Sequence, residues 1–210
     1  MYFEEGGVPK STPPERGRYI MVKAKKMYEY YGKPTFDVSM YIMPEGKRIF
    51  TAYSTLDEAK EWGSAFAAGL NPLPEVVQEV QKYNNMVVFN WRERDEILKK
   101  MVAAGYRCID VYNDDIIEGN VHFKYIYYDG PDVHIHNYVC IRPGEKAIVH
   151  SKGHGSPDSI GCIPHWDETI EYENNEGEIT WRKINAKNDL ECPPRPEKTR
   201  ISDVRDLYPL

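Results

Sequence analysis

The stretch VHFKYIYYDGPDVHIHNYVCIRPGEKAIVHS, residues 121–151, alternates aromatic or β-branched residues with polar ones over three segments. Alternation with a period of two is typical of β-strands that bury one face. Turn-forming residues separate the segments at 129–132 and 142–145, and Pro143-Gly144 suits a type II turn, with Pro at i+1 and Gly at i+2. The stretch therefore predicts three antiparallel strands, 121–128, 133–141 and 146–151.

The flanking sequence extends this β-rich pattern. Segments 18–24, 27–31, 35–43 and 48–54 are rich in β-branched and aromatic residues, and 169–173 with 179–184 predicts a last hairpin. Thr55 and Glu58 form a capping box that begins a helix ending at Gly69, and Pro74 suits the first turn of a second helix. Strand 86–91, helix 95–104 and strand 107–112 predict a βαβ unit. The expected fold class is α+β, with a mostly antiparallel sheet, about three helices and a β-rich C-terminal half.

The chain of 210 residues is long enough for one substantial hydrophobic core. The Gly-Gly pair at 6–7 and three prolines within residues 1–17 predict an extended arm. The proline-rich, mixed-charge residues 185–210 predict a polar tail. A single α+β domain is expected over 18–184, and the prolines near 71–74 mark the point of any subdivision.

Composition excludes several classes of protein. There is no apolar run of the ~20 residues that a membrane-spanning helix needs, and the acidic first residues differ from a secretory signal. We expect a soluble protein, cytoplasmic as synthesised, with no membrane partner. The net charge of −6, from 27 Lys+Arg and 33 Asp+Glu, argues against general nucleic-acid binding but leaves a local basic surface open. The wide spacing of the four cysteines predicts neither a disulfide framework nor a zinc ribbon; they are Cys108, Cys140, Cys162 and Cys192.

Most of the histidines lie within residues 134–165. His134 and His136 fall on one face of a predicted strand, with the spacing of a metal chelate. If Arg142 pairs with Glu145 in a hairpin, His150 lies on the opposite face of the sheet from the two histidines. It is then excluded as a third metal ligand. The pair predicts a metal site, and hydrogen-bonded or solvated strand histidines are the alternative.

A second cluster of chemically active residues follows in 149–163. A histidine ends a predicted strand, a loop of small residues follows, and Gly161 comes directly before Cys162. A thiolate, an imidazole base and backbone N–H groups that stabilise an oxyanion are the parts of an acyl-transfer site. The candidate substrate-binding residues in the loop are His154, Ser156 and Asp158. A buried structural cysteine is the alternative.

The segment Ser159-Ile-Gly-Cys162-Ile163, preceded by His150, resembles the signature of L,D-transpeptidase (YkuD-like) catalytic domains, in particular the compact phage and effector type. The resemblance covers residues 149–163 only, and Ile160 stands where the family usually has a histidine. It implies a cysteine transferase or hydrolase that acts on a peptidoglycan stem peptide, with Cys162 as nucleophile and His150 as base. Ser159 and Gly161 would shape the oxyanion region. No cofactor is implied, and a phage-encoded protein or delivered effector is the expected context.

Two other functions remain open. Sixteen tyrosines and extended arms suit a non-enzymatic binding or assembly protein, viral among other sources, that forms a homo-oligomer through its tails. A metal-binding protein or metalloenzyme centred on His134 and His136 is the third hypothesis.

Two further polar stretches each have a functional and a structural interpretation. Lysines at 23, 25 and 26 and tyrosines at 28, 30 and 31 would suit single-stranded nucleic acid if both types shared a face. Lysines that protect an edge strand are the alternative. Asp110 and the run Asn113-Asp-Asp115 place carboxylates at a strand end, where a polar turn is the favoured interpretation.

Overall fold

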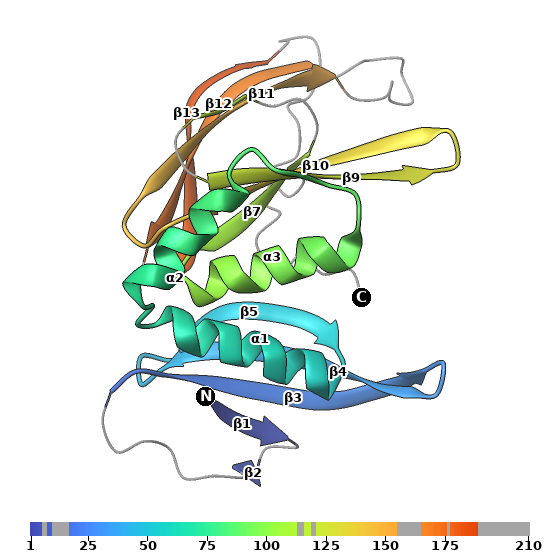
Figure 1. Cartoon of the computed structure of the whole chain (residues 1–210), viewed down its shortest axis with the longest axis vertical. Helices are drawn as coiled ribbons and strands as arrows, with labels where there is room; N and C mark the ends of the chain where they lie inside the picture. The colour runs from blue at the N-terminus through green and yellow to red at the C-terminus, as the bar shows by residue number, and fades with distance from the viewer. Residues whose placement is uncertain are drawn as a thin grey trace. The chain divides into compact units, whose positions relative to one another are not determined.

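The computed structural model describes residues 1–5, 8–9, 17–112, 116–118, 121–154, 165–175 and 177–188 (Figure 1). These residues form two compact units. Unit 1 contains Met1–Lys82 and Asp95–Tyr106, and unit 2 contains Tyr83–Arg94 and the described residues from Arg107 onward. Three α-helices and mostly antiparallel strands in the described part of the chain confirm the α+β class. None of its helices is long and apolar enough to cross a membrane.

Unit 1 contains a sheet with the strand order β2-β1-β3-β4-β5. β3 (Tyr19–Tyr30), β4 (Lys33–Met43) and β5 (Lys47–Ser54) form an antiparallel meander. β1 (Tyr2–Glu5) pairs in parallel with β3, and β2 (Val8–Pro9) pairs with β1, so part of the predicted arm is strand. Tyr31 and Gly32 join β3 to β4 with φ of 48° and 73°, the left-handed conformation that a tight hairpin turn requires.

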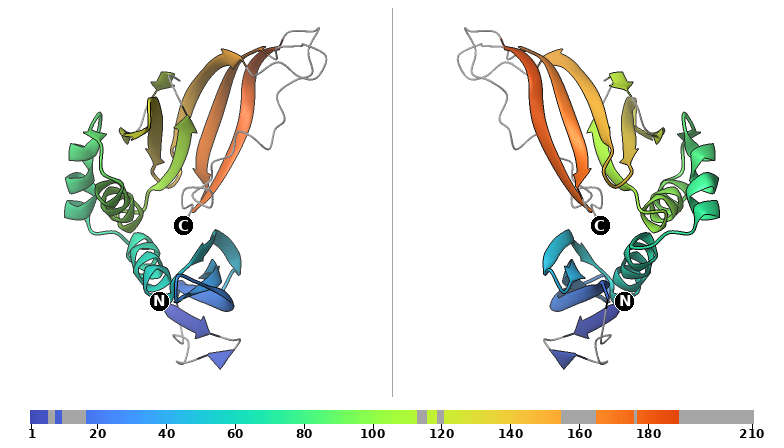
Figure 2. Two further views of the ribbon diagram at one scale, coloured as in Figure 1. Left: turned by 90° about the vertical axis from the view of Figure 1, so that its right-hand side faces the viewer. Right: turned by 90° about the vertical axis from the view of Figure 1, so that its left-hand side faces the viewer.

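Helix α1 (Leu56–Gly69) packs on one face of the β3–β5 meander (Figure 2). Its start confirms the prediction, because Thr55 is the N-cap and forms a capping box with Glu58. The buried side chains of Trp62 and Phe66 contact Phe50 of β5, with ring centroids 6.2 Å and 5.7 Å away. Burial of these rings fixes the helix on the sheet.

Two further helices follow α1. α2 (Pro74–Glu79) begins at the predicted proline and continues into a short 3-10 helix, η1 (Val80–Tyr83). α3 (Trp91–Ala103) begins four residues before the expected Asp95. The reason is a cap that the pattern did not reveal: the Asn90 side chain accepts a hydrogen bond from the Arg92 backbone N–H at 2.8 Å.

Unit 2 contains two four-stranded sheets. The first has the order β6-β9-β10-β7, from β6 (Val87–Val88), β7 (Arg107–Tyr112), β9 (Val121–Asp129) and β10 (Asp132–Ile141). β6 and β7 flank α3 in the chain and share this sheet, but β9 and β10 lie between them, so the expected βαβ unit is not a pair of neighbouring strands. The second has the order β13-β12-β11-β8, from β8 (Ile116–Glu118), β11 (Lys146–His154), β12 (His165–Asn175) and β13 (Glu178–Asn188).

The two sheets of unit 2 face each other across one hydrophobic core (Figure 2). Val139 and Ile141 of β10 are fully buried in the same cluster as Ala147 and Val149 of β11. The turn between them exists as predicted, with Gly144 at φ 76° and a 3.1 Å hydrogen bond from Glu145 N to Arg142 O. The expected β10–β11 hairpin is wrong, however, because the turn passes the chain from one sheet to the other and buries an apolar face of each.

A disulfide joins Cys108 of β7 to Cys140 of β10. The two residues lie directly opposite each other in the antiparallel register, with Cα atoms 4.0 Å apart. Their sequence separation of 32 residues hid this pairing, because spacing alone does not reveal which strands are neighbours.

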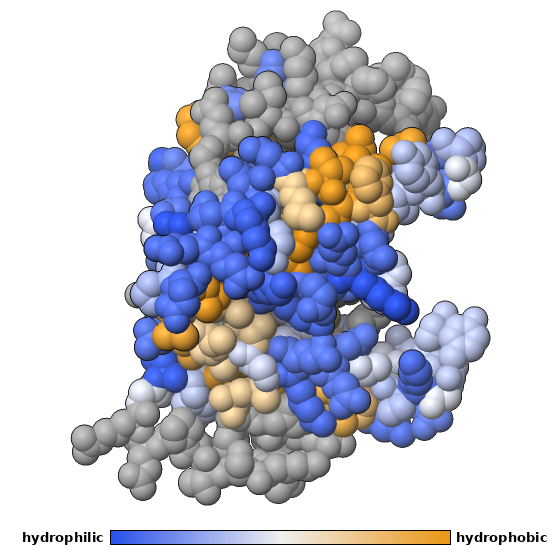
Figure 3. Space-filling model, viewed as in Figure 1, coloured by the Kyte–Doolittle hydropathy of each residue, from blue (hydrophilic) through white to orange (hydrophobic). Residues whose placement is uncertain are grey.

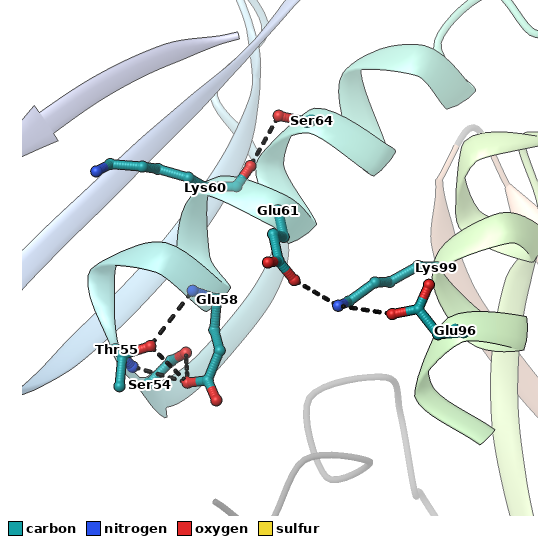
Figure 4. Close-up of polar contacts among 8 residues, drawn as sticks. All are labelled: Ser54, Thr55, Glu58, Lys60, Glu61, Ser64, Glu96 and Lys99. Atoms are coloured by element: carbon teal, nitrogen blue, oxygen red, sulfur yellow. Dashed lines mark hydrogen bonds and ion pairs between the residues drawn. The ribbon is translucent and has the colours of Figure 1, made fainter. Parts of the chain in front are cut away.

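The N-terminus of α1 contains a connected polar network around the Glu58 carboxylate (Figure 4). Glu58 Oε2 accepts hydrogen bonds of 2.9 Å from the Thr55 backbone N–H and from the Ser54 and Thr55 hydroxyls. Burial alone would raise the pKa of Glu58, but these hydrogen bonds and the nearby Lys99 ammonium together hold the pKa below its usual value. The ionised form is therefore the one that stabilises the fold.

Replacement of Glu58 by Gln should destabilise unit 1 by about 1 kcal/mol at pH 7, the usual scale for a helix cap. Because the folded pKa lies below the unfolded one, this contribution is present above the unfolded pKa and is lost as pH falls through the folded value. Urea unfolding from pH 7 to about pH 3 should thus show the two proteins converging in acid. Glu75→Gln, in the first turn of α2, is the matched control, and a pH-independent difference for Glu58→Gln contradicts the assignment.

Candidate functional site

The residues predicted for cysteine chemistry fall partly outside the described chain. Cys162, Gly161, Ser159, Asp158 and Ser156 all lie outside the described residues. His150 lies within β11, and His154 is the last residue of that strand. His154 is paired with His165, the first residue of β12. The segment that contains Cys162 therefore connects the two strands of a long hairpin.

His150 is held by a hydroxyl group from the neighbouring strand. It lies opposite Thr169 in the β11–β12 register, and its Nδ1 is 3.0 Å from Thr169 Oγ1. Val149, next to it, is buried in the core between the sheets, so alternation places His150 on the outer face of the second sheet. A hydrogen bond at one ring nitrogen orients the imidazole for chemistry at the other.

The hairpin limits which histidine Cys162 can reach. His150 lies four positions before His154 of the His154–His165 pair, or about 13 Å at the usual strand rise. Cys162 is three residues before His165 and so lies within about 10 Å of it by chain length. A contact with His150 requires the connecting segment to fold back along the sheet, whereas His154 is close to the base of that segment.

A shallow pocket lies on the second sheet, with a volume of about 230 Å³. Lys146 Nζ and Arg182 Nε are 3.0 Å and 2.8 Å from Glu171 Oε1, and these hydrogen bonds hold the pKa of Glu171 below its usual value. Glu171 is two residues from Thr169 on β12, so the pocket shares the outer face with His150. The lining residues are Lys146, Glu171, Glu173, Thr180, Trp181 and Arg182.

The two histidines of β10 lie on one face of the first sheet, as predicted, within a ladder of aromatic rings. His134 lies opposite Tyr127 of β9, with ring centroids 4.7 Å apart and an interplanar angle of 10°. The same tyrosine ring is 5.8 Å from that of His136. Tyr125 and Tyr138 continue the ladder at 6.2 Å and 6.4 Å from His136. Aromatic stacking therefore accounts for much of the environment of both histidines.

His136 also forms a close pair with Asp110 of β7, with 2.7 Å between Nδ1 and Oδ2. An ionised carboxylate only accepts hydrogen bonds, so Nδ1 carries the proton and donates it. The other carboxylate oxygen, Oδ1, is buried with no hydrogen bond from the described residues. The run 113–115, for which a polar turn is the favoured interpretation, lies outside the described residues.

The metal-site hypothesis gains an orienting carboxylate but no third ligand. Asp110 at Nδ1 of His136 is the arrangement that fixes a metal-binding imidazole to coordinate through Nε2. Within the described residues, however, no group of three or more His, Cys, Asp or Glu side chains is arranged to hold a metal ion. His150 lies in the other sheet, bound to Thr169. Tyr127 stacks with the rings of both histidines.

Sequence reasoning missed two cross-strand pairs between β7 and β10, Asp110–His136 and Cys108–Cys140. A signal was present, since Cys108 and Asp110 share one face of β7, while His136 and Cys140 share one face of β10. Only the β7–β10 register, which pairs Cys140 with Cys108 and Tyr138 with Asp110, brings these faces together. That register joins segments far apart in the chain and cannot be read from local patterns.

The Asp110–His136 pair predicts a specific tautomer. In long-range ¹H–¹⁵N NMR spectra of the neutral imidazole, His136 should carry its proton on Nδ1, because the Asp110 carboxylate accepts it. Asp110→Ala removes that constraint and should change the His136 nitrogen shifts, whereas Asp132→Ala, at the tip of the hairpin, should not. A wild-type His136 protonated on Nε2 would contradict the pairing.

No protein-family model, curated protein or solved structure matches this chain.

Proposed function

We propose that the chain catalyses cysteine-dependent acyl transfer or amide hydrolysis on a peptide substrate, with Cys162 as the nucleophile. The observation that supports this most directly is the hydrogen bond between His150 Nδ1 and Thr169 Oγ1. It orients an imidazole on the same hairpin whose connecting segment carries Ser159-Ile-Gly-Cys162. Nucleophilic cysteine sites combine a thiol, a base and a third group that orients the base.

The chemistry follows from these groups. The histidine accepts the thiol proton, and the thiolate attacks the amide carbonyl to form a tetrahedral intermediate. Backbone N–H groups near Ser159 and Gly161 would stabilise the oxyanion. As the C–N bond breaks, the histidine returns the proton to the departing amine and leaves a thioester on Cys162. An amine or a water molecule then attacks the thioester and regenerates the thiol.

The pocket on the outer face supports a peptide as the substrate class. Its cations and carboxylates, Lys146 and Arg182 with Glu171 and Glu173, offer partners for both the carboxylate and the amine of a zwitterionic peptide. A peptidoglycan stem peptide carries both groups and is the substrate that the cysteine motif implies. The pocket and His150 share one sheet face, so an extended peptide along this face can contact both.

Two histidines, His150 and His154, are candidates for the base that deprotonates Cys162. His150 has the orienting hydroxyl, and His154 is nearer to Cys162 along the hairpin. Single replacements separate them, because loss of the base lowers the fraction of Cys162 present as thiolate, whereas loss of a substrate-binding residue leaves the free thiol unchanged.

The test is the rate of alkylation of intact protein by iodoacetamide without reductant near pH 6.5, where an ordinary thiol is only ~1% ionised. The Cys108–Cys140 disulfide protects two cysteines, so Cys192→Ala leaves Cys162 as the reactive thiol and Cys162→Ala leaves Cys192 as the matched control. Cys162 should react at least ~10-fold faster than Cys192. Either His150→Ala or His154→Ala should remove that advantage and so identify the base. Equal rates for the two thiols contradict the proposal.

A separate experiment tests the proposed substrate class. After incubation with a stem tetrapeptide, mass spectrometry of the intact protein should show an acyl adduct that Cys162→Ala lacks and Cys192→Ala retains. If Cys162 is reactive but this adduct is absent, its assignment as nucleophile stands and the stem peptide is excluded as substrate.

A further inference from the structure

The face of the unit 1 sheet that α1 leaves uncovered displays an ordered set of cations and tyrosines. β-strand alternation alone would place Lys23 and Lys25 of β3 on the opposite face from Tyr28 and Tyr30. The register of β3 against β4 shifts between Lys26 and Tyr28. This β-bulge at Met27 reverses the alternation, so lysines and tyrosines share one face.

The register shows which residues share the face. Lys23 pairs with Ser39 and Lys25 with Asp37, while Phe36 and Val38, which alternate with these β4 residues, are buried toward α1. Beyond the bulge, Tyr28 pairs with Thr35 and Tyr30 with Lys33. On β4, alternation places Thr35 and Lys33 on the same face as Asp37, opposite to the buried Phe36. Both tyrosines therefore lie on the uncovered face, at the end of the sheet formed by the β3–β4 hairpin.

A second bulge adds another cation. The β4–β5 register shifts between Met40 and Tyr41, so that Tyr41 pairs with Arg48 although Met40 pairs with Phe50. This shift places Arg48 on the uncovered face, beside Tyr41. Tyr53 reaches the same face opposite Asp37. Lys23 Nζ lies 5.5 Å from the centre of the Tyr41 ring, which places a cation against an aromatic surface.

The side chains of this face are open to solvent. Tyr28, Tyr30 and Tyr53 are 51%, 62% and 50% exposed, and Lys23, Lys25, Lys33 and Arg48 are also exposed. At the paired positions of β3, β4 and β5 on this face, these four cations outnumber the one carboxylate, Asp37, and Glu4 of β1 pairs with Lys23 in the backbone register. The face is therefore locally basic within a chain of net charge −6.

We infer that this uncovered face of β3, β4 and β5 binds single-stranded nucleic acid. Cations that follow a phosphate backbone and aromatic rings on which bases stack are the two components of sequence-independent single-strand binding. In a duplex, neighbouring base pairs stack on one another and cover the base faces, so exposed tyrosines favour a single strand over a duplex. In Figure 3 the tip of the β3–β4 hairpin ranges from blue to near-white, which suits a polar aromatic ligand better than an apolar surface. The inference is independent of the cysteine chemistry proposed for unit 2.

Fluorescence anisotropy with the full chain and a labelled oligothymidylate of about 15 nucleotides tests the inference. In about 50 mM NaCl we expect a Kd of roughly 1–100 µM, with weaker binding to a duplex of the same length. Tyr28→Ala with Tyr30→Ala should weaken binding at least ~10-fold, because each stacked base contributes substantially. Replacement of Lys23, Lys25 and Arg48 by Gln should reduce the slope of log K against log salt by about 2.

Matched controls separate the face from general effects. Gln at Lys60, Lys82 and Lys100, which are exposed elsewhere in unit 1, removes the same charge and should leave the slope unchanged. Tyr128→Ala removes an exposed tyrosine, 67% exposed, from unit 2 and should leave the affinity unchanged. Three results overturn the inference: no binding up to about 100 µM, binding to the duplex as tight as to the single strand, or equal losses for face and control variants.

Discussion

The packing of β10 against β11 is the constraint on which the arrangement of unit 2 depends. Val139 and Ile141 leave water in one cluster with Ala147 and Val149, and the Arg142–Glu145 turn makes this possible by passing the chain between sheets. Since alternate residues point to opposite faces, the histidines of β10 and His150 of β11 lie on opposite outer faces of the pair of sheets. One apolar contact thus separates the two groups of histidines that the sequence places close together.

Local patterns predicted the elements well and their partners poorly. The capping box of Thr55 and Glu58, the Pro143-Gly144 turn and the alternation of β9 and β10 are all present, because each depends on neighbouring residues. The sheet to which β11 belongs, the Cys108–Cys140 bond and the Asp110–His136 pair depend on contacts between distant segments. The bulge at Met27 is a local feature that was nevertheless not predicted. The residue types at 26–28 do not distinguish a bulge from a continuous strand.

The proposed functions of the two units differ. In unit 2 a histidine held by Thr169 and the segment that contains Cys162 share one hairpin, which suits covalent chemistry on a peptide. In unit 1 two bulges bring cations and tyrosines to one open face, which suits a polyanion with aromatic bases. The aromatic ladder around His136 belongs to neither, and the disulfide beside it links β7 to β10 on the same sheet face.

The central structural claim is that β10 and β11 pack through side chains in separate sheets instead of pairing as a hairpin. Proton NOE spectroscopy of the isotope-labelled chain tests it directly. The account predicts methyl contacts from Val139 and Ile141 to Val149, with backbone contacts between His150 and Thr169. Backbone contacts between His150 and Asn137, which the hairpin would bring opposite each other, would contradict it.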